Sequence, residues 1–188
     1  MFPSALHLSI SKISSVEALL TNGKRCAAVL PSAKSVLLSP RPNVFVDASS
    51  KWGIGIYIDG LWDAWRYRPD HPFTSADINW LEALAVEIGE RAIQARGVQA
   101  TIFSDNTGVI RAFNEKKSRS PLIESSVRRT HSLLQAKKTR VEFLHVPTKD
   151  NPADAYSRGK FGLPERRVVR PLNLPRELSS VVSRAVFW

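Results

Sequence analysis

The chain has 188 residues, 43% of them hydrophobic, a length and composition that suit one domain with a substantial core. Lysine and arginine together number 27 against 17 aspartates and glutamates, so the formal net charge is +10. This excess of positive charge is typical of proteins that meet polyphosphates, and we expect a nucleic acid partner. A solvated basic surface or a membrane-surface binder is the alternative.

The cysteine content and the lengths of the apolar segments indicate which cellular compartment to expect. Cys26 is the only cysteine, which excludes an intrachain disulfide and a zinc site built from several cysteines. A reducing compartment fits, so we expect an intracellular protein of the cytoplasm or nucleus, not a secreted one. The uninterrupted apolar segments fall far below the roughly 18 residues that cross a bilayer, and no membrane partner is expected.

Three segments are expected along the chain. Residues 1–42 are predicted to be an N-terminal extension or linker, because Pro40 and Pro42 interrupt the stretch before the first clear strand. Residues 43–160 are predicted to form the folded domain. Residues 161–188 are predicted to be a basic and apolar C-terminal tail.

The first part of the domain has the pattern of antiparallel strands. A β-rich run over residues 44–46 leads into Asp47, and residues 53–58 alternate isoleucines with glycine and tyrosine, which predicts a strand with one buried face. Asp59-Gly60 is a strong hairpin signal, and residues 61–67 are predicted to return as a third strand.

Helices and strands alternate in the second part. An amphipathic helix is expected from Ile78 to near Gly97 because apolar residues recur at spacings of three and four. After it we predict a strand at 98–104, helices at 106–114 and 123–137, and a strand at 141–146. This order predicts an α/β fold: a mixed five-stranded sheet with three antiparallel strands followed by parallel ones, and helices on both faces.

Four acidic residues stand on four separate segments: Asp47, Glu82, Asp105 and Asp154. Active sites of parallel α/β sheets lie at the carboxyl ends of the strands, so all four could meet at one edge. Carboxylates gathered in this way raise one another's pKa, and divalent metal ions would stabilise the cluster.

Taken singly, each acid has an ordinary structural interpretation. Glu82 could be a solvated helix acid like its neighbours Glu87 and Glu90. Asp47 could begin a turn, Asp105 could cap the following helix, and Asp154 could start a helix.

The sequence around these acids resembles the ribonuclease H domain of retroelement reverse transcriptases, most closely those of gypsy-type and DIRS-type elements. The resemblance covers roughly residues 43 to 160, and Ala153-Asp154 followed by Ser157-Arg158 is its most specific part. The segments that carry it are 46–49, 52–55, 81–85, 104–106, 145–147 and 150–158.

This resemblance implies a metal-dependent endonuclease that hydrolyses the RNA strand of an RNA/DNA hybrid. It implies that Asp47, Glu82, Asp105 and Asp154 are catalytic metal ligands. It also implies a reverse transcriptase polymerase domain as a partner. The family often has a His in the loop before the last acid, and residues 148–153 contain none.

The residue types suit this chemistry independently. Hydrolysis of a phosphodiester needs an activated water and a stabilised leaving oxygen, and two Mg²⁺ ions roughly 4 Å apart supply both when carboxylates bridge them. Hard oxygen ligands select Mg²⁺, for which Mn²⁺ can substitute. We expect Asp47 to bridge both ions, Glu82 and Asp105 to hold the metal near the leaving group, and Asp154 to hold the metal that activates water.

Substrate contacts are expected from amides and cations. Asn79 and Asn106 stand beside proposed ligands and are placed to hydrogen-bond a ribose 2′-hydroxyl, the group that distinguishes RNA from DNA. Lys116, Lys117, Arg119 and Arg158 are expected to bind nucleic acid. The wider predicted basic region adds Arg128, Arg129, Lys137, Lys138, Arg140, Lys160, Arg166, Arg167 and Arg170, with a solvated helix face as the alternative.

Two other functions stay open. A ribonuclease H-like module could bind nucleic acid or support a partner as a scaffold without cutting, and binding without cleavage at millimolar Mg²⁺ would favour it. A transposase or integrase on the same fold would carry its last acid as a Glu on a late helix, whereas Asp154 stands in a loop that contains proline.

Overall fold

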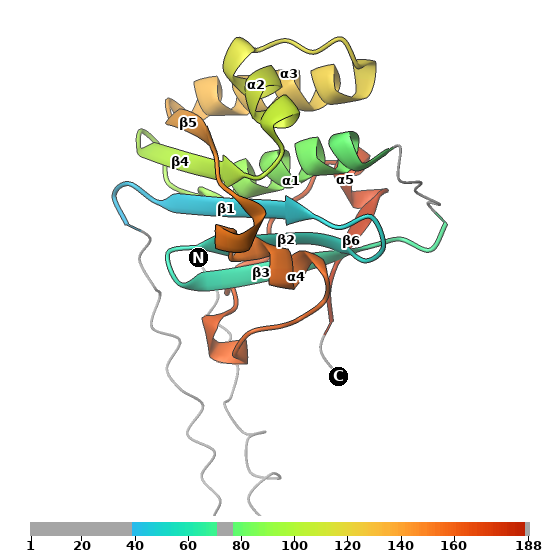
Figure 1. The fold of residues 1–188 in the computed structure, drawn as a ribbon. Helices are drawn as coiled ribbons and strands as arrows, with labels where there is room; N and C mark the ends of the chain where they lie inside the picture. The colour runs from blue at the N-terminus through green and yellow to red at the C-terminus, as the bar shows by residue number, and fades with distance from the viewer. Residues whose placement is uncertain (1–38, 71–76, 187–188) are drawn as a thin grey trace, which may run out of the picture. The chain divides into compact units, whose positions relative to one another are not determined.

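The computed structural model describes residues 39–70 and 77–186, so most of the predicted N-terminal extension lies outside the described residues. A six-stranded mixed sheet forms the centre of this part of the chain (Figure 1), with the strand order β5-β4-β1-β2-β3-β6. Its strands are β1 (Asn43–Ala48), β2 (Gly53–Ile58), β3 (Leu61–Tyr67), β4 (Gln99–Ser104), β5 (Arg140–His145) and β6 (Val182–Arg184).

The mixed topology agrees with the prediction. β1, β2 and β3 pair antiparallel, whereas β4 pairs parallel with both β1 and β5. The Asp59-Gly60 turn joins β2 to β3 with positive φ angles of 47° and 86°, as a two-residue hairpin with a type I′ turn requires. The predicted hairpin is therefore confirmed.

The prediction of five strands was wrong. The sixth strand, β6, comes from the predicted tail and pairs antiparallel with β3. It stays in place because Val181 and Val182 bury their side chains in the core and Arg184 forms an ion pair with the buried Asp63. The tail therefore contributes to the folded domain.

Helices cover one face of the sheet and part of the other. α1 packs on β1, β2 and β4, and α3 packs on α1 (Figure 1). On the opposite face the short α4 lies over β1, β2 and β3. The helices are α1 (Ile78–Ala92), α2 (Thr107–Glu115), α3 (Pro121–Lys137), α4 (Ala153–Ser157) and α5 (Arg176–Ser179), with short 3-10 turns at Thr148–Asp150 and Pro164–Arg166. α1 thus ends five residues before Gly97.

The alternation in β2 separates the two faces as expected. Ile54, Ile56 and Ile58 are buried in the main core with α1. Gly55 points to the other face, where an added Cβ would lie 2.4 Å from the Ser157 backbone nitrogen and 2.6 Å from the Ala153 carbonyl oxygen. This glycine therefore allows α4 to lie directly on the sheet.

Two acids that could have been solvated are buried in the interface between α1 and α3. The Glu87 and Glu90 side chains have no exposed surface; Glu87 pairs with Arg129 at 2.7 Å, and Glu90 with Lys137 at 2.9 Å. The interpretation of Glu87 and Glu90 as solvated helix acids was wrong, because α3 covers this side of α1. In residues 39–70 and 77–186 the structure has no helix that is both long and apolar enough to span a membrane.

Candidate metal centre

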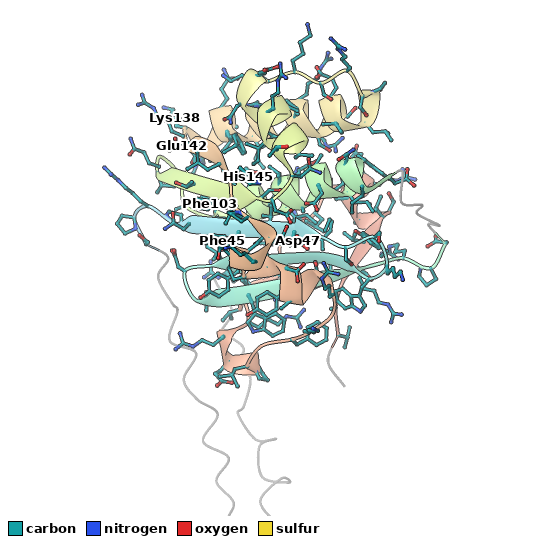
Figure 2. All side chains as sticks on the ribbon, viewed as in Figure 1. Phe45, Asp47, Phe103, Lys138, Glu142 and His145 are labelled. Carbon is teal, nitrogen blue, oxygen red and sulfur yellow. The ribbon has the colours of Figure 1, made fainter. Side chains whose placement is uncertain are left out.

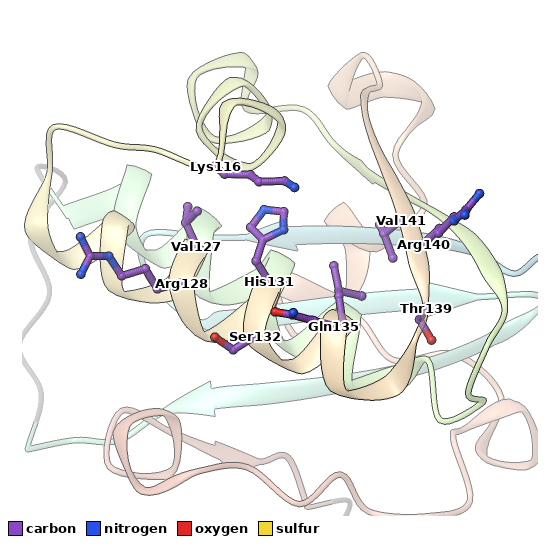
Figure 3. A pocket seen from close by; sticks show the side chains of 10 residues that line it. Lys116, Val127, Arg128, His131, Ser132, Gln135, Thr139, Arg140 and Val141 are labelled. Carbon is purple, nitrogen blue, oxygen red and sulfur yellow. The ribbon is translucent and has the colours of Figure 1, made fainter.

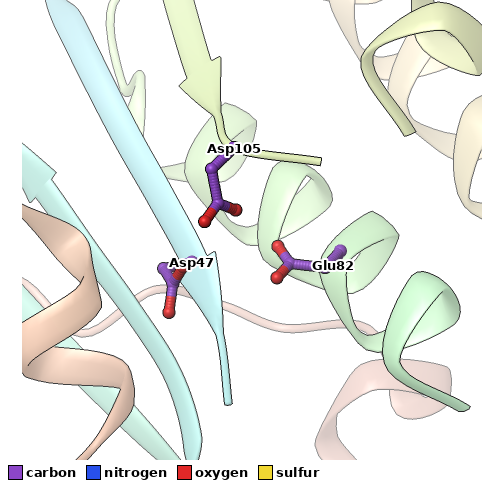
Figure 4. A group of neighbouring side chains, drawn as sticks. All are labelled: Asp47, Glu82 and Asp105. Atoms are coloured by element: carbon purple, nitrogen blue, oxygen red, sulfur yellow. The ribbon is translucent and has the colours of Figure 1, made fainter. Parts of the chain in front are cut away.

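Three of the four predicted acids meet at one edge of the sheet. Asp47 comes from β1, Glu82 from α1, and Asp105 follows β4 directly (Figure 4). One carboxylate oxygen from each lies within 4.8 Å of the others. The predicted convergence therefore holds for Asp47, Glu82 and Asp105.

Strand register brings the two aspartates together. In the parallel pair of β1 and β4, Phe45 is opposite Phe103 (Figure 2), and their rings stack with centroids 4.7 Å apart. Asp47 and Asp105 each stand two residues further along, so they leave adjacent strands at the same level. The fold thus places this carboxylate pair through backbone pairing.

A glycine brings the third acid close. Gly89 lies two helical turns after Glu82 on α1, and a Cβ there would come within 2.5 Å of a Val46 side-chain methyl. Residues seven apart share a helix face, so this close approach to β1 also carries Glu82 toward Asp47. Without the glycine, α1 would have to stand further from the sheet.

Burial and mutual repulsion disfavour the charged carboxylates. Desolvation, reinforced by Asp47 and Asp105, raises the pKa of Glu82 to about 9, although a hydrogen bond from the Ala48 backbone N–H opposes the shift. Desolvation likewise raises the pKa of Asp47 to about 6; the Ser157 hydroxyl opposes this shift, and Asp105 and Asp154 add to it. Without a countercharge, Glu82 is therefore protonated at neutral pH.

These residues fit a divalent cation. The Glu82 Oε2 atom is buried and has no hydrogen-bond partner among the described residues. The ligand set is all carboxylate oxygen, which suits Mg²⁺ or Mn²⁺. A cation here would supply the missing partner and stabilise the ionised carboxylates.

The structure does not bring Asp154 into this group. Its carboxylate on α4 accepts hydrogen bonds from Arg158 Nε at 2.9 Å and Nη2 at 2.7 Å, an i,i+4 pair. Its charge still contributes to the raised pKa of Asp47. The role of Asp154 as a metal ligand therefore stays a prediction.

The loop after β5 contributes residues that the sequence did not reveal. The Thr148 hydroxyl donates to Asp105 Oδ2 at 2.6 Å, and the Asn151 side-chain amide donates to the Val46 carbonyl at 3.0 Å, beside Asp47. The Ser49 hydroxyl donates to the Ser157 carbonyl at 2.7 Å. These bonds tie the loop and α4 to the carboxylate edge, but no local pattern marked them because their partners lie 43 to 108 residues away.

The two predicted asparagines contact each other. Asn106 Nδ2 donates to Asn79 Oδ1 at 2.9 Å, and Asn106 Oδ1 accepts from the Val109 N–H at the start of α2. Asn106 follows Asp105 directly in the sequence, and Asn79 precedes Glu82 on α1. Their contact with a ribose hydroxyl remains a prediction, and Asn106 also has a structural role as a helix cap.

The predicted basic region divides into exposed and paired cations. Lys116, Lys117 and Arg119 are exposed in the connection between α2 and α3. Several other cations of the predicted basic region form ion pairs with acids of the domain. The paired residues are Arg128 with Glu124, Arg129 with Glu87, Lys137 with Glu90, Arg158 with Asp154, and Arg167 with Asp63.

Comparison with solved structures identifies the architecture. The chain is similar to LC11-RNase H1 in complex with an RNA/DNA hybrid, with a TM-score of 0.52 and 15% sequence identity over 62% of this chain and 93% of that chain. The fold is ribonuclease H-like. This agrees with the predicted fold class.

Two further solved structures match with TM-scores below 0.5. RNase H1 from the halophilic archaeon Halobacterium salinarum gives a TM-score of 0.47 at 17% identity, over 64% of this chain and 96% of that one. A foamy viral protease-reverse transcriptase in complex with dsDNA gives 0.40 at 17% identity, over 62% and 88%. No protein-family model and no curated protein matches the chain.

Proposed function

We propose that this protein is a metal-dependent endonuclease that hydrolyses the RNA strand of RNA/DNA hybrids, as in the reverse transcription of a gypsy-type or DIRS-type retroelement. The observation that carries the proposal is the convergence of Asp47, Glu82 and Asp105 within 4.8 Å. The ribonuclease H-like fold supports it, as does the hybrid bound by LC11-RNase H1.

The chain's own residues would act as ligands and positioning groups. Asp47, Glu82 and Asp105 would hold Mg²⁺, with Asp154 as a further ligand once its carboxylate turns from Arg158. Two bound Mg²⁺ ions supply an activated water and stabilise the leaving oxygen. Thr148 positions Asp105 through its 2.6 Å hydrogen bond, and Asn151 fixes the loop that carries Asp154.

Cations and amides would orient the substrate. Lys116, Lys117 and Arg119 would contact phosphates, because they are exposed on one connection and carry no ion pair with a described residue. Asn79 and Asn106 would contact the ribose 2′-hydroxyl. A polymerase domain is the partner that such a nuclease would serve.

A second function has one specific observation in its favour. The pairing of Asp154 with Arg158 leaves the carboxylate group one member short of the predicted four. A ribonuclease H-like module that binds nucleic acid without cutting would tolerate this arrangement. Under this alternative, Asp47, Glu82 and Asp105 would have no catalytic function.

Cleavage of an end-labelled RNA/DNA hybrid tests the proposal. The wild-type protein should cut the RNA strand in Mg²⁺ or Mn²⁺ and stop when EDTA is added. The Asp47→Asn variant should lose cleavage to the background rate, because its amide cannot supply a charged oxygen, and it should remain folded because the wild-type carboxyl is already partly neutral near pH 6. Arg111→Gln, which breaks the exposed ion pair with Glu115, is the control and should retain cleavage.

Substrate controls separate the candidates. Double-stranded DNA of the same sequence should remain intact if the hybrid is the substrate. If the wild-type protein binds the hybrid but leaves it uncut across millimolar Mg²⁺ and Mn²⁺, the non-catalytic module is the correct interpretation.

A further inference from the structure

A groove of about 780 Å³ lies away from the carboxylates, between α2, α3 and the start of β5 (Figure 3). Its walls come from three parts of the chain: the end of α2, one side of α3, and the beginning of β5. It is lined by Lys116, Val127, Arg128, His131, Ser132, Leu134, Gln135, Thr139, Arg140 and Val141.

The charge of this groove is positive only. Lys116, Arg128 and Arg140 line it, and none of its ten lining residues is acidic. Arg128 is bound to Glu124 at 2.8 Å, but neither Lys116 nor Arg140 forms an ion pair with another described residue. Two exposed cations therefore face a hollow whose lining contains no acidic residue, which favours an anionic ligand.

The remaining lining suits a ligand with both charged and uncharged parts. Val127 and Leu134 are buried and form an apolar floor. His131 Nε2 lies 2.9 Å from the Phe113 carbonyl and donates to it, which holds the ring in place. Gln135 and Ser132 add uncharged polar groups along α3. Phosphates would meet the cations, and sugars would meet these uncharged polar groups.

A second hollow continues the first around the start of β5. It has a volume of about 450 Å³ and shares Arg140 and Val141 with the groove. Arg41 adds another cation, and Glu142 is the one acidic residue of this second lining. Cations therefore recur along a path rather than at a single point, as an extended polyanion requires.

The groove is separate from the candidate metal centre. α2 begins beside Asp105 and runs nine residues to Glu115, so Lys116 stands roughly 14 Å away at 1.5 Å per residue. A phosphate held at the carboxylates cannot also touch Lys116. A strand several nucleotides long can span both.

We propose that the groove between α2, α3 and β5 binds the phosphodiester backbone of a nucleic acid several nucleotides from the phosphate at the carboxylates. The position of this contact relative to the scissile phosphate rests on the proposed function, whereas the binding does not. An acidic peptide or a free polyphosphate would share the charge, but neither combines regularly spaced phosphates with sugars whose hydroxyls match the exposed polar groups of Ser132 and Gln135.

Binding of a fluorescein-labelled 20-base-pair RNA/DNA hybrid in EDTA tests this proposal. Arg140→Glu and Lys116→Glu should each weaken binding on the order of tenfold near 0.1 M salt and lower the slope of log K against log salt by about 0.9, the effect of losing one phosphate contact. Arg176→Glu makes the same charge change at an exposed position outside both hollows and should bind like the wild type. Circular dichroism verifies that each variant is folded.

Three results would overturn the proposal. Arg140→Glu could bind as tightly as Arg176→Glu, with an equal salt slope. Tripolyphosphate could displace the hybrid at an equal concentration of charge, indicating a small anionic ligand. Polyglutamate could do the same, indicating an acidic peptide partner. Because EDTA removes the metal, these binding data stay interpretable even if the wild-type protein cuts no hybrid, so failure of the proposed function and failure of the groove are distinguishable.

Discussion

Among single residues, the buried carboxylates of the candidate metal centre lower the stability of the folded state when they are ionised and no cation is bound. Burial raises the pKa of Glu82 to about 9 and that of Asp47 to about 6, against ordinary values of 4.5 and 3.8. Ionisation of either group in the folded chain is therefore costly. A bound divalent cation offsets this cost, which links metal binding to proton release.

This linkage predicts how stability depends on pH. Both folded-state pKa values lie above the unfolded ones, so between roughly pH 4 and 9 the folded state holds more protons and stability falls as the pH rises. In EDTA, urea unfolding should show a loss of at least about 1.4 kcal/mol from pH 5 to pH 9, the equivalent of one pKa unit. Saturating Mg²⁺ should restore most of it.

The Glu82→Gln variant should flatten this dependence, because a neutral amide resembles the protonated acid. Glu115→Gln, at an exposed position on α2, is the matched control and should keep the wild-type dependence. A Glu82→Gln protein whose stability in EDTA still falls like that of the control would show that burial of these acids is not the cause.

Some of these residues could be predicted from sequence and others could not. Asp47 and Asp105 each follow a β-rich run, and the pairing of adjacent parallel strands brings them together. The ion pair of Asp154 with Arg158 could have been predicted, because an i,i+4 spacing on a helix favours it. Thr148 could not be found, because its contact with Asp105 depends on how the loop after β5 folds back.

At the element scale, the position of α4 depends on a close approach to β2. Gly55 lies under this helix, where any side chain would meet the Ser157 and Ala153 backbone atoms. α4 in turn carries Asp154 and, through Ser49 and Ser157, is joined to the end of β1. The packing of this short helix therefore decides whether a fourth carboxylate can reach the other three.

Gly55→Ala should displace α4 and destabilise the protein by about 1–3 kcal/mol, because the new methyl overlaps backbone atoms that cannot rotate away. Thermal unfolding measures the loss, and hybrid cleavage should fall with it. Gly108→Ala is the control: its Cβ would lie 3.4 Å from Asn106 Oδ1, within a helix that favours alanine. Equal stabilities for the two variants would contradict the role of Gly55.

The elements themselves were predictable because their signals are local. Apolar spacing located α1, and alternation located β2. The environment of α1 was not predictable, since Glu87 and Glu90 are buried by Arg129 and Lys137, which lie 42 and 47 residues further along the chain. A helix acid that faces a distant cation has the same local pattern as one that faces water.

In the described domain as a whole, a buried cluster of three charged residues holds the C-terminal segment against β3. Asp63 on β3 has no exposed surface and binds Arg167 at 2.7 Å and Arg184 at 2.8 Å. Desolvation raises the pKa of Asp63, and its two arginines oppose the shift. These contacts fasten the chain on either side of α5 to β3.

Replacing Asp63 with alanine should destabilise the protein by about 3–5 kcal/mol, because it removes the carboxylate that compensates the charge of two largely buried guanidinium groups. Urea unfolding measures the change. Arg111→Ala breaks the exposed pair with Glu115 and should cost less than about 0.5 kcal/mol. Comparable losses in the two variants would mean that the triad does not hold the tail.

The sixth strand, β6, could not be predicted from local sequence patterns. The sequence around Val181 and Val182 is equally typical of an apolar tail, and no neighbouring residue in the sequence indicates a partner strand. The pairing depends on β3 being at an edge of the sheet and on Asp63, which lies 121 residues from Arg184. Only the assembled sheet creates the edge that this segment completes.

Calorimetric titration of Mn²⁺ into the wild-type protein and Glu82→Gln at pH 8, in two buffers of different ionisation enthalpy, tests whether these carboxylates form a metal centre. The wild-type protein should bind Mn²⁺ and release about one proton, because Glu82 with its pKa of about 9 must ionise. Glu82→Gln should bind at least tenfold more weakly and release almost none. Equal isotherms for the two proteins, or no binding by the wild type at millimolar Mn²⁺, would contradict the claim that these carboxylates form a metal centre.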